Sequence, residues 1–303
     1  DVEGAGAGPE DALLSLAMGR EVKIALLRGM CELAETFGRD GTHNFLLPYL
    51  ISFMNDFAWE VRAAFCEEAA SLPKKVGQVS TEGIIWPCYE QALLDQEERV
   101  LQAALSGLVA LVGEKLLRRQ SLTNVASKVA PLLVHPSATI RSRATAVLKA
   151  VGEQLNAVDQ YVFIMPAVRP FLQFALVGVA SIDGALVPPL SRRAFERALL
   201  RRDEELHEAL LHKRPVPQVL KDELPQADSE ALELMRPYLH LILRSRPAMP
   251  QAGNASWPLG VAFKEDQLGA LTAQPGMVHN LHYPAMNPHC APNRSLQATA
   301  ESD

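Results

Sequence analysis

A repeated apolar pattern constrains the fold of this chain more than any other feature of its sequence. Series of apolar residues begin at Val22, Val61, Val100 and Ile140, so the starts are 39, 39 and 40 residues apart. Each series continues at offsets of 4, 8, 11 and 15, and only Lys115 departs from this pattern. Such offsets place side chains on one face of a helix. Each series therefore predicts one amphipathic helix.

The four predicted apolar faces can be written out residue by residue. They are Val22, Leu26, Met30, Leu33 and Phe37; Val61, Phe65, Ala69, Leu72 and Val76; Val100, Ala104, Leu108 and Leu111; and Ile140, Ala144, Leu148, Val151 and Leu155. Gly38, Gly77 and Gly113 follow three of them, and glycine is the residue that most often ends a helix. We expect these glycines to end the helices.

A second apolar helix is expected in each copy, over about 43–54, 82–94, 121–134 and 157–174. Pro48 and Pro87 lie near the start of the first two, and Asp56 and Asp95 follow eight residues later. An aspartate in such a turn can accept backbone N–H groups at the start of the next helix. A proline inside a helix costs about 3 kcal/mol, so its recurrence predicts a bend that neighbouring copies accommodate.

Helix pairs that recur at about 40 residues are typical of HEAT and armadillo arrays. One pair cannot bury its own apolar face, so copies stack and each contacts its neighbours. We therefore predict an all-α fold of the HEAT/armadillo-type helical-repeat solenoid class. A composition of 48% hydrophobic but only 6% aromatic residues fits an aliphatic core between close helices. The alternative, an irregular helical bundle, has no reason to keep a 39-residue period.

The pattern divides the chain into four expected parts. Residues 1–19 are interpreted as a linker or partial repeat, and 20–175 as a solenoid of about four helix pairs. Residues 176–245 are an irregular helical extension, with a helix capped by Ser191 and another over 229–244. Residues 246–303 are rich in Pro, Gly, Asn, Ala and Gln without a period, which predicts a disordered or extended tail.

Charge and composition restrict the classes of function. A net charge of −6 and a pI near 5.8 argue against a general nucleic-acid binder. No apolar run reaches the roughly 18 residues that span a bilayer, and no signal peptide is found. The four cysteines form no C-x-x-C pair, which favours reduced thiols in a cytosolic protein. The chain opens on Asp1, so we expect a piece of a longer protein.

No residue of this chain is predicted to be catalytic, to bind a cofactor or to bind a metal. His279, His282, His289 and Cys290 lie close together, and H-x-x-H could begin a zinc site. The flanks are rich in Pro and Asn, no second tight ligand pair follows, and acids are missing nearby. We therefore expect no metal there.

Six residues are candidates for contacts with partner proteins: Trp59, Arg62, Arg141, Arg192, Arg193 and Arg197. Trp59 opens a repeat helix beside a turn, where packing across the turn is the first interpretation and a partner contact the alternative. Arg62 and Arg141 each follow the first residue of an apolar series. The last three arginines share a helix surface with acids, which favours a solvated face over docking of a partner or anionic lipid.

The order of motifs resembles one known family over about residues 22–214. The stretches VKIALLRGMCELAETFG, LLPYLISFMND, WEVRAAFCEEA, VAPLLVHPSATIRSRA, FIMPAVRPFL and LSRRAFERALL follow one another. In this order they look like the helical-repeat region of the vacuolar protein sorting fifteen family. Its members are protein-kinase-like regulatory subunits of the class III phosphatidylinositol 3-kinase complex.

The resemblance implies a three-part protein with a kinase-like domain, a HEAT solenoid and a WD-repeat propeller. It implies as partners the lipid kinase catalytic subunit, a Beclin-type subunit and an exchangeable autophagy or endosomal subunit. It also implies a cytoplasmic location, peripheral to endosomal, vacuolar or autophagic membranes. This chain lacks the family's myristoylation site and any G-x-G-x-x-G, H-R-D or D-F-G motif, so no ATP or Mg²⁺ site is expected.

The resemblance thus predicts a non-catalytic scaffold segment. Two alternatives stay open at this point: a free-standing HEAT adaptor for transport or phosphatase assembly, and an enzyme with its site in 246–303.

Overall fold

The computed structural model describes residues 19–47, 52–199, 204–212, 214–215 and 224–245. All of them belong to one compact unit, Asp1–Ala255, whereas the second unit, Ser256–Asp303, lies outside the described residues. The described part is helical, and its extended pairing is limited to an isolated bridge between Leu172 and Leu186. The predicted all-α class is confirmed for this part of the chain.

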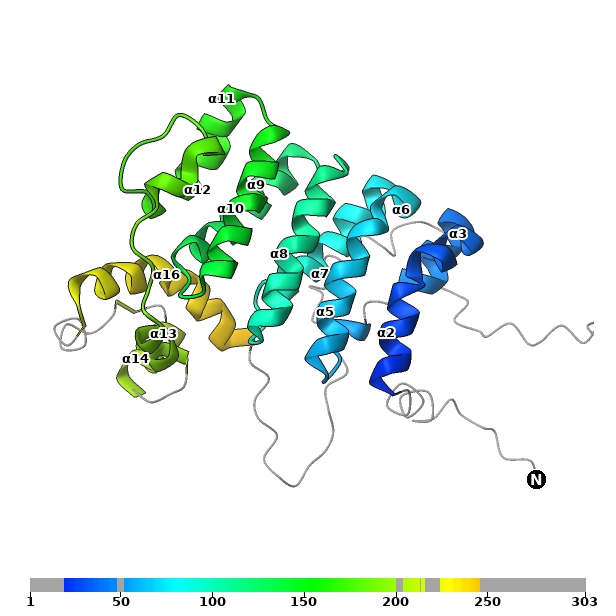
Figure 1. Cartoon of the computed structure of the whole chain (residues 1–303), viewed down its shortest axis with the longest axis horizontal. Helices are drawn as coiled ribbons and strands as arrows, with labels where there is room; N and C mark the ends of the chain where they lie inside the picture. Colours follow the sequence, from blue (N-terminus) through cyan, green and yellow to red (C-terminus); the bar gives the residue numbers. More distant parts are fainter. Residues whose placement is uncertain (1–18, 48–51, 200–203, 213, 216–223, 246–303) are drawn as a thin grey trace, which may run out of the picture. The chain divides into compact units, whose positions relative to one another are not determined.

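One series of helices carries the apolar faces of the repeats. Its members are α2 (Arg20–Arg28), α3 (Met30–Gly41), α5 (Trp59–Glu68), α8 (Glu98–Gly113) and α10 (Ala138–Glu153). Helix α5 packs against α2 on one side and α8 on the other, and α8 packs in turn against α10 (Figure 1). Each helix of the series therefore contacts its neighbours along the chain, as the repeat period predicts.

The second series alternates with the first and contains several short segments. The first helix of the second copy continues from α5 through η2 (Ala69–Ser71) into α6 (Pro73–Ser80), where it is interrupted at Gly77. The members of the second series are η1 (Thr42–Leu46), η3 (Thr81–Ile85), α7 (Trp86–Ala92), α9 (Arg119–Val129), η4 (Ala130–Val134), α11 (Ala157–Asp159), η5 (Gln160–Ile164), α12 (Met165–Val168) and η6 (Arg169–Phe171). The predicted second helices at 82–94, 121–134 and 157–174 therefore form, but each is made of consecutive segments with different helical geometry.

The second, third and fourth predicted apolar faces form the core. Val61, Val100 and Ile140 are fully buried, as are the residues that follow each of them by 4, 8 and 11 positions, except that Phe65 keeps 3% exposure. Leu155 is only half-buried. Lys115, the departure from the pattern, lies just after α8 and is exposed.

The first predicted face is wrong in part. Val22, Leu26 and Phe37 are 54%, 36% and 51% exposed, while Leu27 and Met30 are fully buried. The face that Val22 begins corresponds to the face that α5 buries against α2. The buried residues of α2 are Lys23 and Leu27, so its buried stripe lies one residue further along the chain than the repeat pattern predicts.

Prolines inside the second series follow widened turns. The π-helical segments η3 and η5 end two residues before Pro87 and Pro166, respectively. Proline lacks the N–H that an α-helix needs, and its ring clashes with the carbonyl four residues earlier. A π turn shifts the hydrogen bonds by one residue, which lets the helix continue through the proline.

Two of the three predicted helix-ending glycines adopt a backbone that other residues rarely take. Gly38 and Gly77 have φ values of 65° and 80° with ψ near 180°, a region nearly exclusive to glycine. Helix α8 ends at Gly113 as predicted, but there Lys115 supplies the positive φ, at 59°.

The remaining segments are η7 (Val179–Ala185), α13 (Arg192–Leu199), α14 (Glu204–Leu211) and α16 (Gln226–Ser245). Ser191 caps α13 as predicted, because its Oγ accepts the N–H of Ala194 at 3.3 Å. The side chain of Asp228 accepts both the N–H and the O–H of Ser191, at 2.8 and 2.7 Å. This ties the start of α13 to α16.

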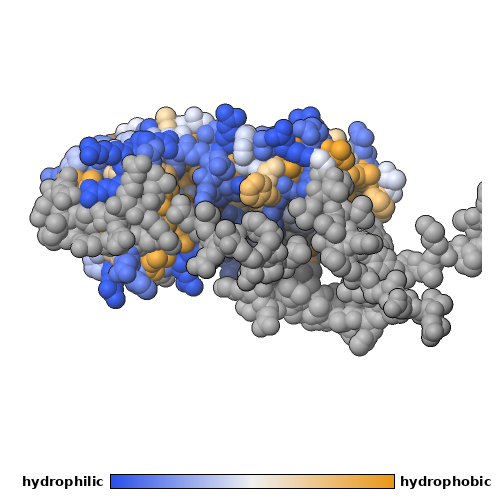
Figure 2. Space-filling view, turned by 90° about the horizontal axis from the view of Figure 1, so that it is seen from below, coloured by the Kyte–Doolittle hydropathy of each residue, from blue (hydrophilic) through white to orange (hydrophobic). Residues whose placement is uncertain are grey.

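Helix α16 also packs against η4 of the repeats (Figure 1). The hydroxyl of Tyr238 donates to the carbonyl of Leu93 at 2.9 Å, and the N–H of Leu190 donates to the carbonyl of Val134 at 2.9 Å. On the face shown in Figure 2, described residues are mainly hydrophilic, with apolar side chains between them. The predicted tail at 246–303 and the cluster around His279 lie outside the described residues.

Candidate functional site

The turns between helix pairs carry ion pairs that join successive repeats. Asp56 accepts the backbone N–H of Ala58 through Oδ1 at 2.9 Å. Ala58 is the residue before α5 and no side chain caps that helix, so the aspartate orders the turn and the predicted cap does not form. Oδ2 of Asp56 accepts the ammonium of Lys23 from the preceding repeat at 2.6 Å. Each side chain of this pair is 11–12% exposed, so the pair is shielded from water.

Asp95 repeats this geometry one repeat later. Its Oδ1 accepts the N–H of Glu97 at 2.9 Å, and its two oxygens accept Nε and Nη2 of Arg62 at 2.7 and 3.0 Å. Nη1 of Arg62 donates to the carbonyl of Asp56 at 2.7 Å. The structure therefore places Arg62 in a joint between repeats, where Nε, Nη1 and Nη2 all donate hydrogen bonds within the chain.

The third turn keeps this geometry without the ion pair. Nδ1 of His135 accepts the N–H of Ser137 at 3.1 Å, in the manner of the aspartates. Arg141 donates to the carbonyls of His135 and Pro136 at 2.7 and 2.8 Å, as Arg62 does to its own turn. Burial lowers the pKa of His135 from its ordinary value of 6.5 to about 4. The centres of its ring and of the Phe195 ring lie 4.8 Å apart in an edge-to-face arrangement.

The three arginines of α13 do not form a common site. Arg192 is hydrogen-bonded and ion-paired to Glu98 at the start of α8, and this hydrogen bond lowers the pKa of Glu98. Arg193 is exposed and Arg197 is half-buried. Of the six predicted contact residues, therefore, Arg62, Arg141 and Arg192 hold parts of this chain together.

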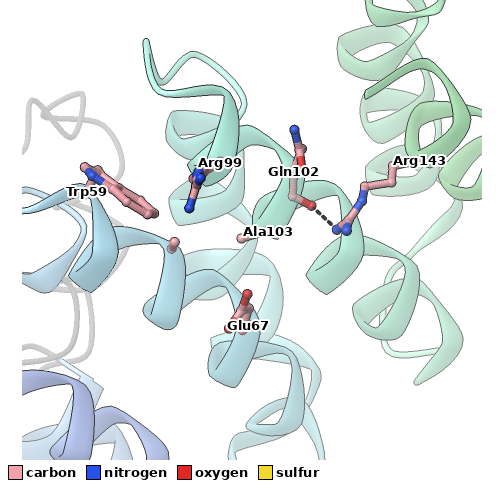
Figure 3. Close-up of a pocket in the computed structure, with 7 residues that line it drawn as sticks. Trp59, Glu67, Arg99, Gln102, Ala103 and Arg143 are labelled. Carbon is pink, nitrogen blue, oxygen red and sulfur yellow. Dashed lines mark hydrogen bonds between the residues drawn. The ribbon is translucent and has the colours of Figure 1, made fainter. Parts of the chain in front are cut away.

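Trp59, the remaining predicted contact residue, lines a groove across α5, α8 and α10. The groove has a volume of about 510 Å³ and is lined by Trp59, Ala63, Glu67, Arg99, Gln102, Ala103 and Arg143 (Figure 3). Trp59, Ala63 and Glu67 are four residues apart on α5, so they form one line along that helix. Arg99, Gln102 and Ala103 form the facing line on α8, and Arg143 comes from α10.

Trp59 has two roles in this arrangement. It is partly buried and packs against the hydrophobic core. The guanidinium carbon of Arg99 lies 5.2 Å from the centre of its ring, which is a cation–π distance. One part of the indole therefore stabilises the fold, and another part borders the groove.

The two groove arginines have no carboxylate partner among the described residues. Nη1 of Arg143 donates to the carbonyl of Gln102 at 2.8 Å and to the hydroxyl of Ser106. Arg99 is exposed and is placed by its contact with Trp59. Guanidinium, amide and indole groups bind ligands through hydrogen bonds and stacking, so this arrangement is suited to recognition.

Arg99, Gln102 and Arg143 are absent from the sequence-based prediction, although the repeat contains a signal for both arginines. Three residues after the start of each series stand Ala25, Ala64 and Ala103 in the first three copies, but Arg143 in the fourth. One residue before the start stand Glu21 and Glu60, but then Arg99. Departures from a repeat that stacking does not require are candidate functional positions.

Helices that stack in series through ion-paired turns define an all-helical repeat protein. Among the helices of the described ranges, none is long and apolar enough to cross a membrane. Residues 10–199 match the family described as PIK3R4-like, middle domain. The chain belongs to this family and is a homologue of the VPS15 proteins.

Three relatives illustrate the range of similarity. The chain is 36% identical over 151 residues to the probable serine/threonine-protein kinase vps15 of Dictyostelium discoideum and 37% over 179 residues to serine/threonine-protein kinase VPS15 of Arabidopsis thaliana. It is 28% identical over 175 residues to VPS15 of Saccharomyces cerevisiae. These matches cover 50%, 58% and 57% of this chain but only 8%, 12% and 12% of the relatives.

Proposed function

We propose that this chain is a non-catalytic scaffold segment of the regulatory subunit of a class III phosphatidylinositol 3-kinase complex. The observation that carries this proposal is the match of residues 10–199 to the middle-domain family. Relatives named as VPS15 serine/threonine-protein kinases are 36% and 37% identical to this chain over 151 and 179 residues. In this role the segment supports complex assembly in autophagy and in endosomal or vacuolar protein sorting.

The geometry supports a scaffold because the repeats are joined by residues outside the groove. Lys23, Asp56, Arg62 and Asp95 join the repeats, whereas the groove presents Arg99 and Arg143, which have no carboxylate partner in the described part of the chain. A rigid array whose surface can vary suits the binding of several subunits at once. The proposed partners are the lipid kinase catalytic subunit, a Beclin-type subunit and an exchangeable autophagy or endosomal subunit. The proposed location is cytoplasmic and peripheral to the membranes on which they act.

Co-purification tests this proposal. The 303-residue chain is expressed with the lipid kinase catalytic subunit and the Beclin-type subunit of the same organism, and the complex is isolated through a tag on the chain. We expect both subunits to co-purify and to form crosslinks to residues of the repeats. A folded chain that recruits neither subunit would contradict the proposal. Recruitment of phosphatase or transport subunits instead would favour a free-standing adaptor.

A further inference from the structure

The groove of Trp59, Arg99 and Arg143 is unusual because its charges are not required by the repeat. The position of Arg143 is alanine in the three other copies, so an arginine there is not a feature of the repeat itself. Arg99 stands one residue before its series, and the two preceding copies have Glu21 and Glu60 at this position. Both substitutions add positive charge to the same groove, which is lined by residues from three successive repeats.

The nearby carboxylates do not neutralise these arginines. Glu60 of α5 accepts Arg20 at 2.8 Å, and Glu98 of α8 is ion-paired to Arg192. The carboxylate in the lining itself is Glu67, which has no ion pair among the described residues. The lining therefore carries two positive charges and one negative charge.

Several donors of the groove remain available to an added ligand. A guanidinium carries five N–H donors in a rigid fork, and Arg143 uses Nη1 for its two intramolecular hydrogen bonds. These bonds hold Arg143 beside Gln102, on the opposite side of Ala103 from Arg99 and Trp59 (Figure 3). An arginine held in this way loses little freedom when it binds a carboxylate in bidentate fashion.

The floor of the groove is apolar and small. Ala63 and Ala103 are 9% and 4% exposed and come from facing helices. Together with the indole of Trp59 they provide contact area for a short apolar side chain. A ligand that satisfies all of these groups carries separate carboxylates for the two arginines and an apolar residue between them.

We propose that this groove binds an acidic segment of a partner protein, with carboxylates on Arg99 and Arg143 and an apolar side chain against Trp59, Ala63 and Ala103. The inference rests on the proposed scaffold function and identifies the surface through which one partner is held. A peptide fits better than an anionic headgroup, because the two arginines lie on either side of an apolar floor and do not converge on one point.

Charge reversal tests the proposal in the full 303-residue chain. The probe is the purified subcomplex of lipid kinase catalytic subunit and Beclin-type subunit, and affinity is measured by interferometry at low and high salt. Arg99→Glu combined with Arg143→Glu is expected to weaken binding by roughly thirty-fold or more, since like charges then oppose each other. The salt dependence of binding is expected to flatten in the variant.

Arg28→Glu is the matched control, because Arg28 is an exposed arginine of α2 outside the groove. It should change affinity less than about two-fold, as exposed charges distant from a site usually do. Arg99→Glu alone provides a second test, because the side chain of Arg99 makes no hydrogen bond or ion pair with the described residues that its loss would break. Thermal unfolding of each variant shows that it is folded at the temperature of the measurement.

Failure of this proposal and failure of the proposed function give different results. Equal binding of wild type and Arg99→Glu/Arg143→Glu would overturn the groove proposal and leave the scaffold function intact. No binding of the subcomplex by the folded wild-type chain would overturn both. If the reversal abolished binding to phosphatidylserine vesicles but not to the subcomplex, the groove would be a lipid site and the proposal would be wrong.

Discussion

His135 occupies the turn position that Asp56 and Asp95 hold in the two preceding copies. It keeps their backbone contact, since Nδ1 accepts the N–H of Ser137, but it carries no charge in its buried site. The corresponding residue of the preceding repeat is Leu101, where the earlier copies have Lys23 and Arg62. Acid and base are thus lost together, which avoids a buried charge without a partner.

Acidification should destabilise the protein through His135. Its pKa is about 4 when folded, below its ordinary value of 6.5. Between these values the unfolded chain binds a proton that the folded protein excludes, so stability falls as pH falls from 6.5 to 4, by up to about 1.4 kcal/mol per pH unit. Urea unfolding at pH 7.0, 5.5 and 4.5 measures this slope.

His135→Asn separates this effect from other acid-sensitive groups. Asparagine retains an oxygen that can accept the Ser137 N–H, but it does not titrate. The variant should therefore show a shallower loss of stability over the same pH range. Because Glu98, Arg192 and Arg141 also influence His135 electrostatically, they stay unchanged in this comparison. Identical pH slopes in both proteins would show that the His135 proton is not responsible.

Some residues could be assigned from the sequence, and others could not. The cap by Ser191 and the turn contacts of Asp56 and Asp95 follow from local chemistry, because each bonds a backbone group two or three residues away. The two aspartates reach the residue before the helix, so they do not cap α5 and α8 as predicted. The intramolecular partners of Arg62, Arg141 and Arg192 depend on which elements meet in space. The apolar period indicates on which face of a helix a residue lies, but not which group of another element lies opposite that residue.

At the scale of elements, the joint between α5 and α8 is held by Arg62 and Asp95. Their side chains are 16% and 11% exposed, so their interaction is screened less than that of a surface pair. Arg62→Met and Asp95→Asn should each reduce the free energy of unfolding by about 1–3 kcal/mol. Chemical denaturation of the full chain measures both changes.

The double variant shows whether the two residues act together. Asparagine at position 95 can still accept the N–H of Glu97, so the cycle isolates the interaction with Arg62. We expect the double variant to lose about 1–2 kcal/mol less than the sum of the single variants. Simple additivity would mean that the two side chains contribute independently.

The existence of the helices was predictable, but their internal geometry was not. The 39-residue period identifies the helix pairs because every copy faces the same packing requirement. The π-helical turns η3 and η5 precede Pro87 and Pro166, and the apolar pattern contains no signal for them. The first apolar face was wrong in part: its spacing matches the repeat, but Lys23 and Leu27 are buried in α2 in place of Val22 and Leu26.

At the scale of the whole molecule, α16 is fastened to the repeats through Tyr238. Its hydroxyl donates to the carbonyl of Leu93, and the ring is 3% exposed. Tyr238→Phe leaves that buried carbonyl without this donor, which should cost about 1–3 kcal/mol. Hydrogen exchange should then speed up in α16 more than in α8. Equal acceleration in both helices would show that they unfold as one unit.

The docking of α16 onto the repeats could not be predicted from the periodicity of the sequence. The sequence predicts helices after Ser191 and near 229–244, and both form, but neither repeats the 39-residue pattern that reveals stacking. Likewise the groove needed three helices in place before Trp59, Arg99 and Arg143 could be seen as neighbours. The sequence shows that Arg99 and Arg143 differ from the corresponding residues of the other copies, but it does not show that they lie on the same surface.

The separation along the chain between bonded residues has a consequence for folding kinetics. Side-chain bonds between repeats, such as Lys23 to Asp56 and Arg20 to Glu60, join residues 33 and 40 positions apart, whereas Arg192 to Glu98 spans 94 and Tyr238 to Leu93 spans 145. Each doubling of a closed loop adds about 0.6 kcal/mol of entropy cost, and contacts between close positions form faster. We therefore expect the repeats to assemble one after another as the chain leaves the ribosome, and α16 to dock last, after synthesis of its own residues.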